Sequence, residues 1–207
     1  MEFRKIDREN WARKESFDHY FRDIPCTYSI TVQLDITKLR KEKRKLFPEL
    51  LYCLAAAVNR HEEFRTAVNG SGELGVYSEM HPCYTVFHKD TETFSNLWTP
   101  YTPDRTAFRT AFEKDMKTYG DNHGMFGKPD TPPNSFTVSV LPWASFEGFN
   151  LNLQKGYTYL IPIFTFGKFY EENHRTVIPL AVQVHHAVCD GFHLCRFLSE
   201  VQELLDE

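Results

Sequence analysis

Several features that would mark other protein classes are missing from this sequence. It opens with Met1-Glu2-Phe3-Arg4-Lys5, which is charged and therefore unlike the start of a secretory signal. No apolar run approaches the length of a membrane span. The five cysteines are odd in number and form no CxxC pair, which favours reduced thiols. We therefore expect a cytoplasmic protein with no membrane partner.

The sequence also lacks an excess of basic charge, and its formal net charge is −4. This predicts no nucleic-acid partner, although a local basic patch could still hold a phosphate. There is no internal repeat and no Gly/Ser-rich linker, so the 207 residues predict a single domain, 1–207. Aromatic residues make up 15% of the chain. That share is typical of a Phe-rich core and equally of an apolar ligand pocket.

Strand and helix patterns alternate without a regular βαβ rhythm. Helices are predicted at 47–64, 106–119 and 192–205. Strands are predicted at 28–37, around Val76, and at 84–88, 136–141, 160–169 and 177–185. A polar turn at 171–175 indicates a hairpin between the last two strands, and 120–134 is predicted to be a long loop. We expect the α+β class, with a two-layer mixed β-sheet packed with helices.

The strand predicted at 177–185 leads into a segment rich in histidine. Its apolar residues occupy even positions, so a strand extended by one residue would place His186 on the apolar side and His185 on the other. A histidine that is neutral at working pH is suited to general-base chemistry, and Asp190 could hold a ring or the loop. Gly191 permits a sharp turn into the final helix.

From the residues alone, two other interpretations of this segment remain open. The histidines could be a structural pair at a strand end. They could also contribute to a metal site, although the spacing matches no common zinc pattern. The ligands of such a site would be His185, His186, Cys189 and His193.

The string HHAVCDGFH (185–193) resembles the signature of the chloramphenicol acetyltransferases. Its inner HxxxDG is shared with the acyltransferase cores of 2-oxo acid dehydrogenase complexes. Other segments resemble the family in the same order, so the likeness covers nearly the whole chain. They are WARKE (11–15), YTVFH (84–88) with TETF (91–94), LPW (141–143) and FNLN (149–152).

The resemblance implies a CoA-dependent acyltransferase fold and a homotrimer with active sites at the subunit interfaces. It implies that acetyl-CoA donates its acetyl group to the 3-hydroxyl of chloramphenicol in one ternary complex, with no metal involved. His186 would be the general base and Ser139 would stabilise the oxyanion. Asp190 and Arg13 would form a salt bridge that orders the active-site loop.

The resemblance also implies the residues that bind the two substrates. Thr165 would lie near the oxyanion, linked to it through water, and cations should meet the CoA phosphates. The acceptor pocket would include Tyr20, Cys26, Phe94, Phe126, Phe149 and Leu151. CoA would contact Lys168, Lys45, Trp143 and Phe169. Phe169 stands where many relatives carry tyrosine, and His19 lies at a pocket mouth that varies in the family.

Three rival functions share parts of this pattern. An acyltransferase with a different acceptor alcohol would keep His186 and Ser139 and change only the pocket. A catalytically silent trimer used as a scaffold would have no need of His186, Asp190, Ser139 and Arg13 together. A metal protein would use the histidine and cysteine cluster.

Overall fold

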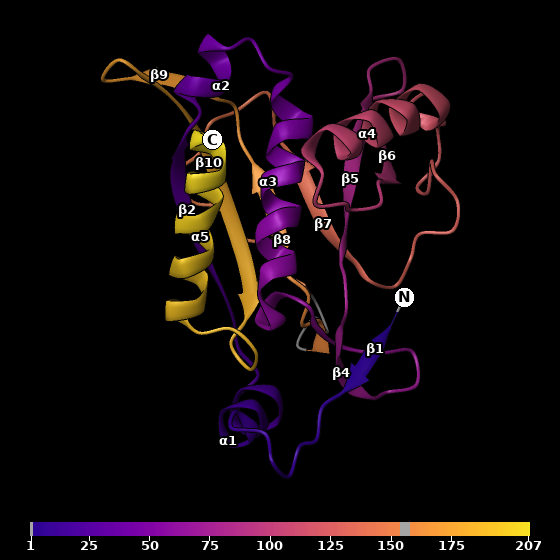
Figure 1. The fold of residues 1–207 in the computed structure, drawn as a ribbon, viewed down its shortest axis with the longest axis vertical. Helices are drawn as coiled ribbons and strands as arrows, with labels where there is room; N and C mark the ends of the chain where they lie inside the picture. Colours follow the sequence, from indigo (N-terminus) through magenta and orange to yellow (C-terminus); the bar gives the residue numbers. More distant parts are fainter. Residues whose placement is uncertain (1, 154–157) are drawn as a thin grey trace.

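A computed structural model of the chain describes residues 2–153 and 158–207 (Figure 1). The strands are β1 Phe3–Lys5, β2 Thr27–Asp35, β3 Thr66–Val68, β4 Leu74–Tyr77, β5 His81–His88, β6 Thr93–Trp98, β7 Ser135–Val140, β8 Ile163–Phe166, β9 Tyr170–Glu172 and β10 Arg175–His185. The α-helices are α1 Lys14–Asp18, α2 Thr37–Lys41, α3 Leu46–Arg60, α4 Arg105–Tyr119 and α5 Gly191–Asp206. A π-helical turn, η1, covers His19–Asp23, and a 3₁₀ turn, η2, covers Glu62–Phe64.

The large sheet is mixed, with strand order β2-β10-β8-β7-β5-β6 and β9 paired to β10. β7 runs parallel to β5 and β8, while β10 is antiparallel to β2, β8 and β9. A small sheet has the order β1-β4-β3. Helices α5, α3 and α4 lie along one face of the large sheet (Figure 1). The predicted α+β class, a mixed sheet packed with helices, is confirmed.

The alternation in β10 decides which residues face the helices. Leu180, Val182 and Val184 are buried in the core, together with Phe164 of β8 and Phe197 of α5. The rings of Phe164 and Phe197 are stacked with centroids 5.5 Å apart. Truncating a buried phenylalanine of this kind to alanine typically costs about 3–5 kcal/mol. The even positions of β10 therefore face the core that the sheet shares with α5.

The opposite face of the sheet carries smaller and more polar residues. Ser139, Thr165 and Ala181 lie side by side on β7, β8 and β10, in register. Leu151, which follows β7 in the chain, lies over this face, where its backbone N–H donates to Gln183 Oε1 at 3.0 Å. Directly opposed residues in neighbouring strands share a face, so Ser139 and Thr165 point away from the helices.

Several predicted boundaries were wrong. The helix predicted to Phe64 ends at Arg60, and Glu62–Phe64 forms the 3₁₀ turn instead. The strand predicted at 160–169 is interrupted after Phe166, where a Cβ on Gly167 would lie 2.6 Å from Pro179 Cγ. Pairing with β10 resumes in β9, so the hairpin is confirmed.

Its turn consists of Asn173 and His174, both with positive φ (49° and 65°). β10 ends at His185, so the one-residue extension to His186 on which the alternation argument was conditional does not occur. Strands β1, β3 and β6 and helices α1 and α2 were not predicted. β9 covers Tyr170–Glu172, where the predicted strand had ended and the polar turn was expected to begin. In the part of the chain that the structure describes, no helix has the length and apolar character needed to cross a membrane.

Candidate active site

His186 lies one residue beyond β10 and is fixed from several sides. Its backbone N–H donates to the carbonyl of Cys26 at 2.9 Å. The Tyr20 ring is stacked on the imidazole, with centroids 3.9 Å apart and an interplanar angle of 11°. Tyr28 meets the imidazole edge-on at 5.4 Å. The side chain is 29% exposed, but Nδ1 has no contact with solvent. A base that acts on a ligand from this ring must therefore use Nε2.

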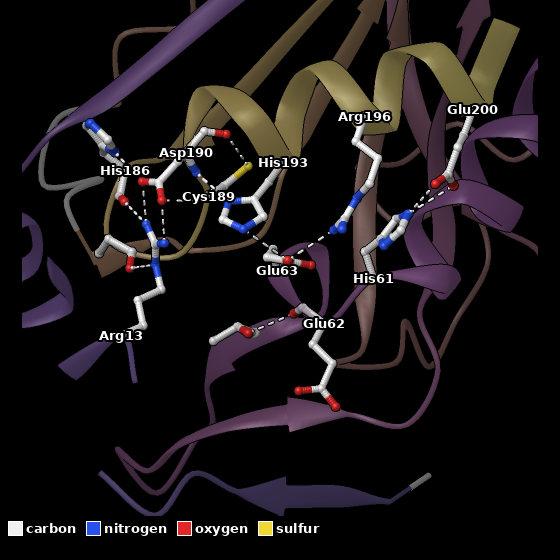
Figure 2. Close-up of polar contacts among 12 residues, drawn as sticks. Arg13, His61, Glu62, Glu63, His186, Cys189, Asp190, His193, Arg196 and Glu200 are labelled. Atoms are coloured by element: carbon white, nitrogen blue, oxygen red, sulfur yellow. Dashed lines mark hydrogen bonds and ion pairs between the residues drawn. The ribbon is translucent and has the colours of Figure 1, made fainter. Parts of the chain in front are cut away.

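The loop that carries His186 is held by Arg13, which comes from the other end of the chain (Figure 2). The guanidinium donates two hydrogen bonds of 2.6 Å to the two carboxylate oxygens of Asp190. It also donates to the backbone carbonyls of His186 at 2.9 Å and Ala187 at 2.7 Å. All four bonds close on one short loop, so Arg13 fixes where the His186 backbone lies.

Both partners of this ion pair are charged at neutral pH. Hydrogen bonds donated by Arg13 lower the pKa of Asp190. Burial, the largest single influence on Arg13, opposes its charge, but the hydrogen bonds to Asp190 and the attraction of nearby negative charges, Asp190 first, together outweigh burial and raise the pKa of Arg13. Asp190 Oδ1 also lies 3.2 Å from His186 Nδ1.

Ser139 lies in a second group of residues, on the face of the sheet away from the helices. Thr165, which is 2% exposed, is its neighbour in register on β8. Thr165 lines a narrow cavity together with Phe149, Leu151 and Gln183. Ser139, Thr165, Phe149 and Leu151 thus lie in one region.

A set of exposed aromatic side chains adjoins the strands on the β5 side. Trp143 meets Phe87 edge-on at 4.8 Å and Phe94 at 6.3 Å. Phe126 lies in the 120–134 loop, bridged to Asn96 of β6. Trp143 is 57% exposed and Phe126 is 69% exposed. Aromatic surface left open to this extent is typical of a ligand site or a protein interface.

Within one chain, Ser139 and His186 do not come together. Ala181 lies two strands away from Ser139 in register, and His185 is four residues further along β10. With a rise of about 3.3 Å per residue and a spacing of about 4.8 Å between strands, the Cα atoms of Ser139 and His185 are about 16 Å apart. The predicted site residues therefore form two half-sites. Tyr20, Cys26, Arg13 and Asp190 accompany His186, and Thr165, Phe149 and Leu151 accompany Ser139.

The residues predicted to bind CoA also lie in different places. Lys168 and Phe169 line a cavity of about 390 Å³ with Phe47 and Pro142. Its walls are mostly apolar, and the guanidinium of Arg40 lies 4.7 Å from the centroid of the Phe169 ring. Lys45 is not free at this position, because its ammonium pairs with Glu113 at 2.8 Å. Trp143, also predicted to be a CoA wall, lies away from this cavity lining and packs with Phe87 and Phe94.

Two residues were not singled out from the sequence, one beside His186 and one in the Ser139 half-site. Tyr28 touches the imidazole, and its hydroxyl donates to the carbonyl of Cys189 at 3.2 Å. Gln183 holds the Leu151 backbone over the sheet. The polar side chain of Gln183 in an otherwise apolar strand was a usable signal. Tyr28 offered none, because its contact depends on how β2 pairs with β10.

The metal interpretation gains no support from the geometry. Among residues 2–153 and 158–207, no three His, Cys, Asp or Glu side chains are grouped so as to hold a metal ion. His185 is 1% exposed, and its Nδ1 accepts a hydrogen bond from the Ala187 N–H at 3.1 Å. Burial raises the pKa of the Cys189 thiol to about 12. The surroundings of His185 and Cys189 are therefore those of residues that support the structure, not of metal ligands.

Comparison with known proteins gives one family. Residues 1–202 match the profile of a family described as "Chloramphenicol acetyltransferase". A chloramphenicol acetyltransferase of Campylobacter coli is 62% identical over 207 residues, covering 100% of both chains. A solved structure titled "chloramphenicol acetyltransferase" has a TM-score of 0.83 at 24% identity, covering 99% of this chain and 100% of that one. A dihydrolipoamide acetyltransferase of Azotobacter vinelandii has a TM-score of 0.65 at 18% identity, covering 91% and 85%. The two structures share the fold.

Proposed function

The chain belongs to the chloramphenicol acetyltransferase family, and from this we propose that it transfers the acetyl group of acetyl-CoA to the 3-hydroxyl of chloramphenicol. It is an acyltransferase, and acetyl transfer to chloramphenicol inactivates the antibiotic. The observation that carries the mechanism is the environment of His186. An imidazole stacked on Tyr20, with Nδ1 enclosed, presents Nε2 as its only nitrogen available to a ligand.

In the proposed reaction both substrates are bound together. Nε2 of His186 accepts the proton of the acceptor hydroxyl while that oxygen attacks the thioester carbonyl carbon. The tetrahedral intermediate then collapses, the C–S bond breaks, and the imidazolium returns its proton to the leaving thiolate. The products are the 3-O-acetyl ester and CoA, and no acetyl-enzyme is formed. Positioned base catalysis contributes about 10²–10⁴-fold, and holding both substrates in reacting geometry adds to this.

The oxyanion of that intermediate needs a hydrogen-bond donor in a dry site. We assign this role to the Ser139 hydroxyl, with Thr165 beside it to hold a bridging water. Their register on adjacent strands supports the assignment, since it places both hydroxyls on the same face. The neighbouring Phe149 and Leu151 would exclude bulk water and contact the acceptor.

A complete site requires a second subunit. His186 and Ser139 are too far apart on one chain to act on one substrate, so the His186 half-site of one copy must face the Ser139 half-site of another. A closed ring of three identical subunits, the proposed homotrimer, would complete three such sites. Trp143, Phe94 and Phe126 supply apolar surface that such an interface would cover. Each subunit is proposed to be one domain, because a single core cluster extends from Phe17 to Leu205.

The 390 Å³ cavity lined by Lys168 and Phe169 is the proposed site for part of CoA. Its apolar walls suit the pantetheine arm or the adenine ring, and the Lys168 ammonium suits a phosphate. Lys45 is a weaker candidate, because binding a phosphate would require it to leave Glu113.

The decisive experiment measures thiol release from acetyl-CoA with and without chloramphenicol. We expect release only when chloramphenicol is present, with mass spectrometry showing one added acetyl group at the 3-hydroxyl. A panel of other alcohols serves as the control for acceptor choice. Good transfer to another alcohol with none to chloramphenicol would show a different acceptor, and no transfer to any of them would favour the scaffold alternative. Full activity after treatment with a chelator is expected, and its loss together with bound zinc would favour the metal protein.

A further inference from the structure

His193 lies in the first turn of α5 and contacts the end of the loop 186–190, which carries the proposed base His186. The backbone N–H of Asp190 donates to His193 Nδ1 at 3.0 Å. This is the place where a glutamate or glutamine accepts the same bond in a capping box. Nδ1 must be unprotonated to accept, so a neutral His193 carries its proton on Nε2. The ring is thus an acceptor on the loop side and a donor on the other.

The donor side of His193 reaches Glu63 of η2, with Nε2 and Oε1 3.2 Å apart (Figure 2). Arg196 donates to the same carboxylate oxygen at 3.1 Å. The turn that carries Glu63 is firmly packed, because the neighbouring Phe64 is 1% exposed and stacks on Phe197 of α5 at 4.5 Å. Glu63 therefore provides a fixed point for the His193 ring.

Packing alone does not hold the loop on this side. A cavity of about 340 Å³ is lined by Trp11, Arg13, Glu63, Val188 and His193. Where side chains leave such a space, polar bonds must set the position of the backbone. His193 Nδ1 also lies 3.8 Å from Asp190 Oδ2, one of the two oxygens that Arg13 bonds. The loop is thus held by Arg13 from one side and by His193 from the other.

We propose that His193 and Glu63 are positioning residues for His186. A neutral His193 links the Asp190 backbone to Glu63 and so fixes the loop from which His186 projects. The inference rests on the proposed function of His186. Histidine suits this position better than glutamate, because a glutamate would accept the Asp190 bond but place a second carboxylate beside Glu63.

Helix α5 takes part in a second histidine–carboxylate pair, which serves as a matched control. His61 lies 2.9 Å from Glu200 of α5 (Figure 2). Arg60 approaches that carboxylate at 3.5 Å, as Arg196 approaches Glu63. The His61 and His193 side chains are similarly buried, 14% and 20% exposed. The His61 contacts do not reach residues 186–190. His61→Leu therefore removes an equivalent pair without touching the loop.

The test compares His193→Leu, His193→Asn and His61→Leu as purified full-length proteins. Asparagine keeps an acceptor, Oδ1, near the position of Nδ1, whereas leucine removes it. We expect His193→Leu to lower kcat about tenfold through a sub-ångström shift of the base, with both KM values little changed. His193→Asn should recover most of the lost kcat, and His61→Leu should stay within about twofold of the wild type.

Hydrogen exchange of the Asp190 amide gives a readout that needs no substrate. Exchange should accelerate in His193→Leu, return toward wild type in His193→Asn and remain unchanged in His61→Leu. If His193→Leu does not fold, Glu63→Ala and Glu63→Gln replace it, with faster exchange and lower kcat expected only for alanine. Equal behaviour of His193→Leu and His61→Leu, or of the two Glu63 variants, overturns the inference. A wild type without transferase activity defeats the proposed function but leaves the exchange result standing.

Discussion

Arg13 and Asp190 are 177 positions apart in the chain, yet two 2.6 Å hydrogen bonds join the guanidinium to both carboxylate oxygens. The same guanidinium bonds the backbone carbonyl of His186, so one side chain neutralises the carboxylate and fixes the base. These two tasks are separable, because only the first depends on Asp190.

The first prediction concerns breaking this pair. Arg13→Met alone removes the hydrogen bonds that hold the His186 loop and leaves the Asp190 carboxylate without its cation. We therefore expect a lower kcat. The double variant with Asp190→Leu removes the uncompensated charge, so kcat should partly recover. Steady-state kinetics of both variants at neutral pH measure this, and a double variant worse than Arg13→Met would contradict it.

The second prediction is the pH range over which the pair stabilises the fold. Arg13 lowers the pKa of Asp190 below its ordinary value of 3.8, so the stabilisation is fully present above that value. It is lost as the pH falls through the pKa of the folded state. The difference in thermal midpoint between wild type and Asp190→Asn should therefore be constant from pH 8 to pH 5 and shrink below about pH 4. A difference that disappears between pH 7 and 6 would mean that a histidine is responsible.

Much of this fold was predictable from short-range patterns. The alternation in β10 and the apolar stripes of α3 and α5 predicted their burial, because each element packs one face on the same core. Strands β1 and β3 were missed because they are three residues long and owe their existence to pairing with β4. Residues of that kind carry no periodic signal of their own.

The residues of the candidate site also divide into those that local sequence patterns reveal and those that depend on contacts between distant segments. The histidine segment was visible because its residues are contiguous, whereas the ion pair with Arg13 was implied only by the family resemblance. Tyr28 was missed because its contact with His186 depends on strand register. The separation of Ser139 from His186 follows from the order β7-β8-β10, which no local pattern specifies. The pairing of Lys45 with Glu113 depends on α4 lying beside α3.

The third prediction tests whether the site lies between subunits. His186→Ala should lower kcat by about 10²–10⁴-fold or more, and Ser139→Ala by about 10²–10³-fold with little change in KM. Both variants should remain folded trimers. When they are unfolded together in equal amounts and refolded, about one quarter of the sites in random mixed trimers should pair an intact His186 with an intact Ser139.

The mixture should therefore recover about a quarter of wild-type kcat. Simply mixing the two folded variants, without subunit exchange, is the control and should recover nothing. If the refolded mixture is as inactive as its parts, His186 and Ser139 must act from the same chain. That result would contradict the two half-sites inferred from the strand register.

The fourth prediction separates the two lysines proposed to meet CoA. Lys168 lines the 390 Å³ cavity, while Lys45 is paired with Glu113 at 2.8 Å. Lys168→Ala should raise the KM for acetyl-CoA about tenfold, since a charge-assisted bond to phosphate contributes roughly 1.5 kcal/mol or more. Lys45→Ala should have a smaller effect, and the KM for chloramphenicol should not change in either variant.

Acetyl-CoA without its 3′-phosphate shows which phosphate group of CoA Lys168 binds. If Lys168 meets that phosphate, the wild type and Lys168→Ala should have similar KM values for the dephosphorylated substrate. A tenfold difference that persists there would place the lysine at the pyrophosphate instead.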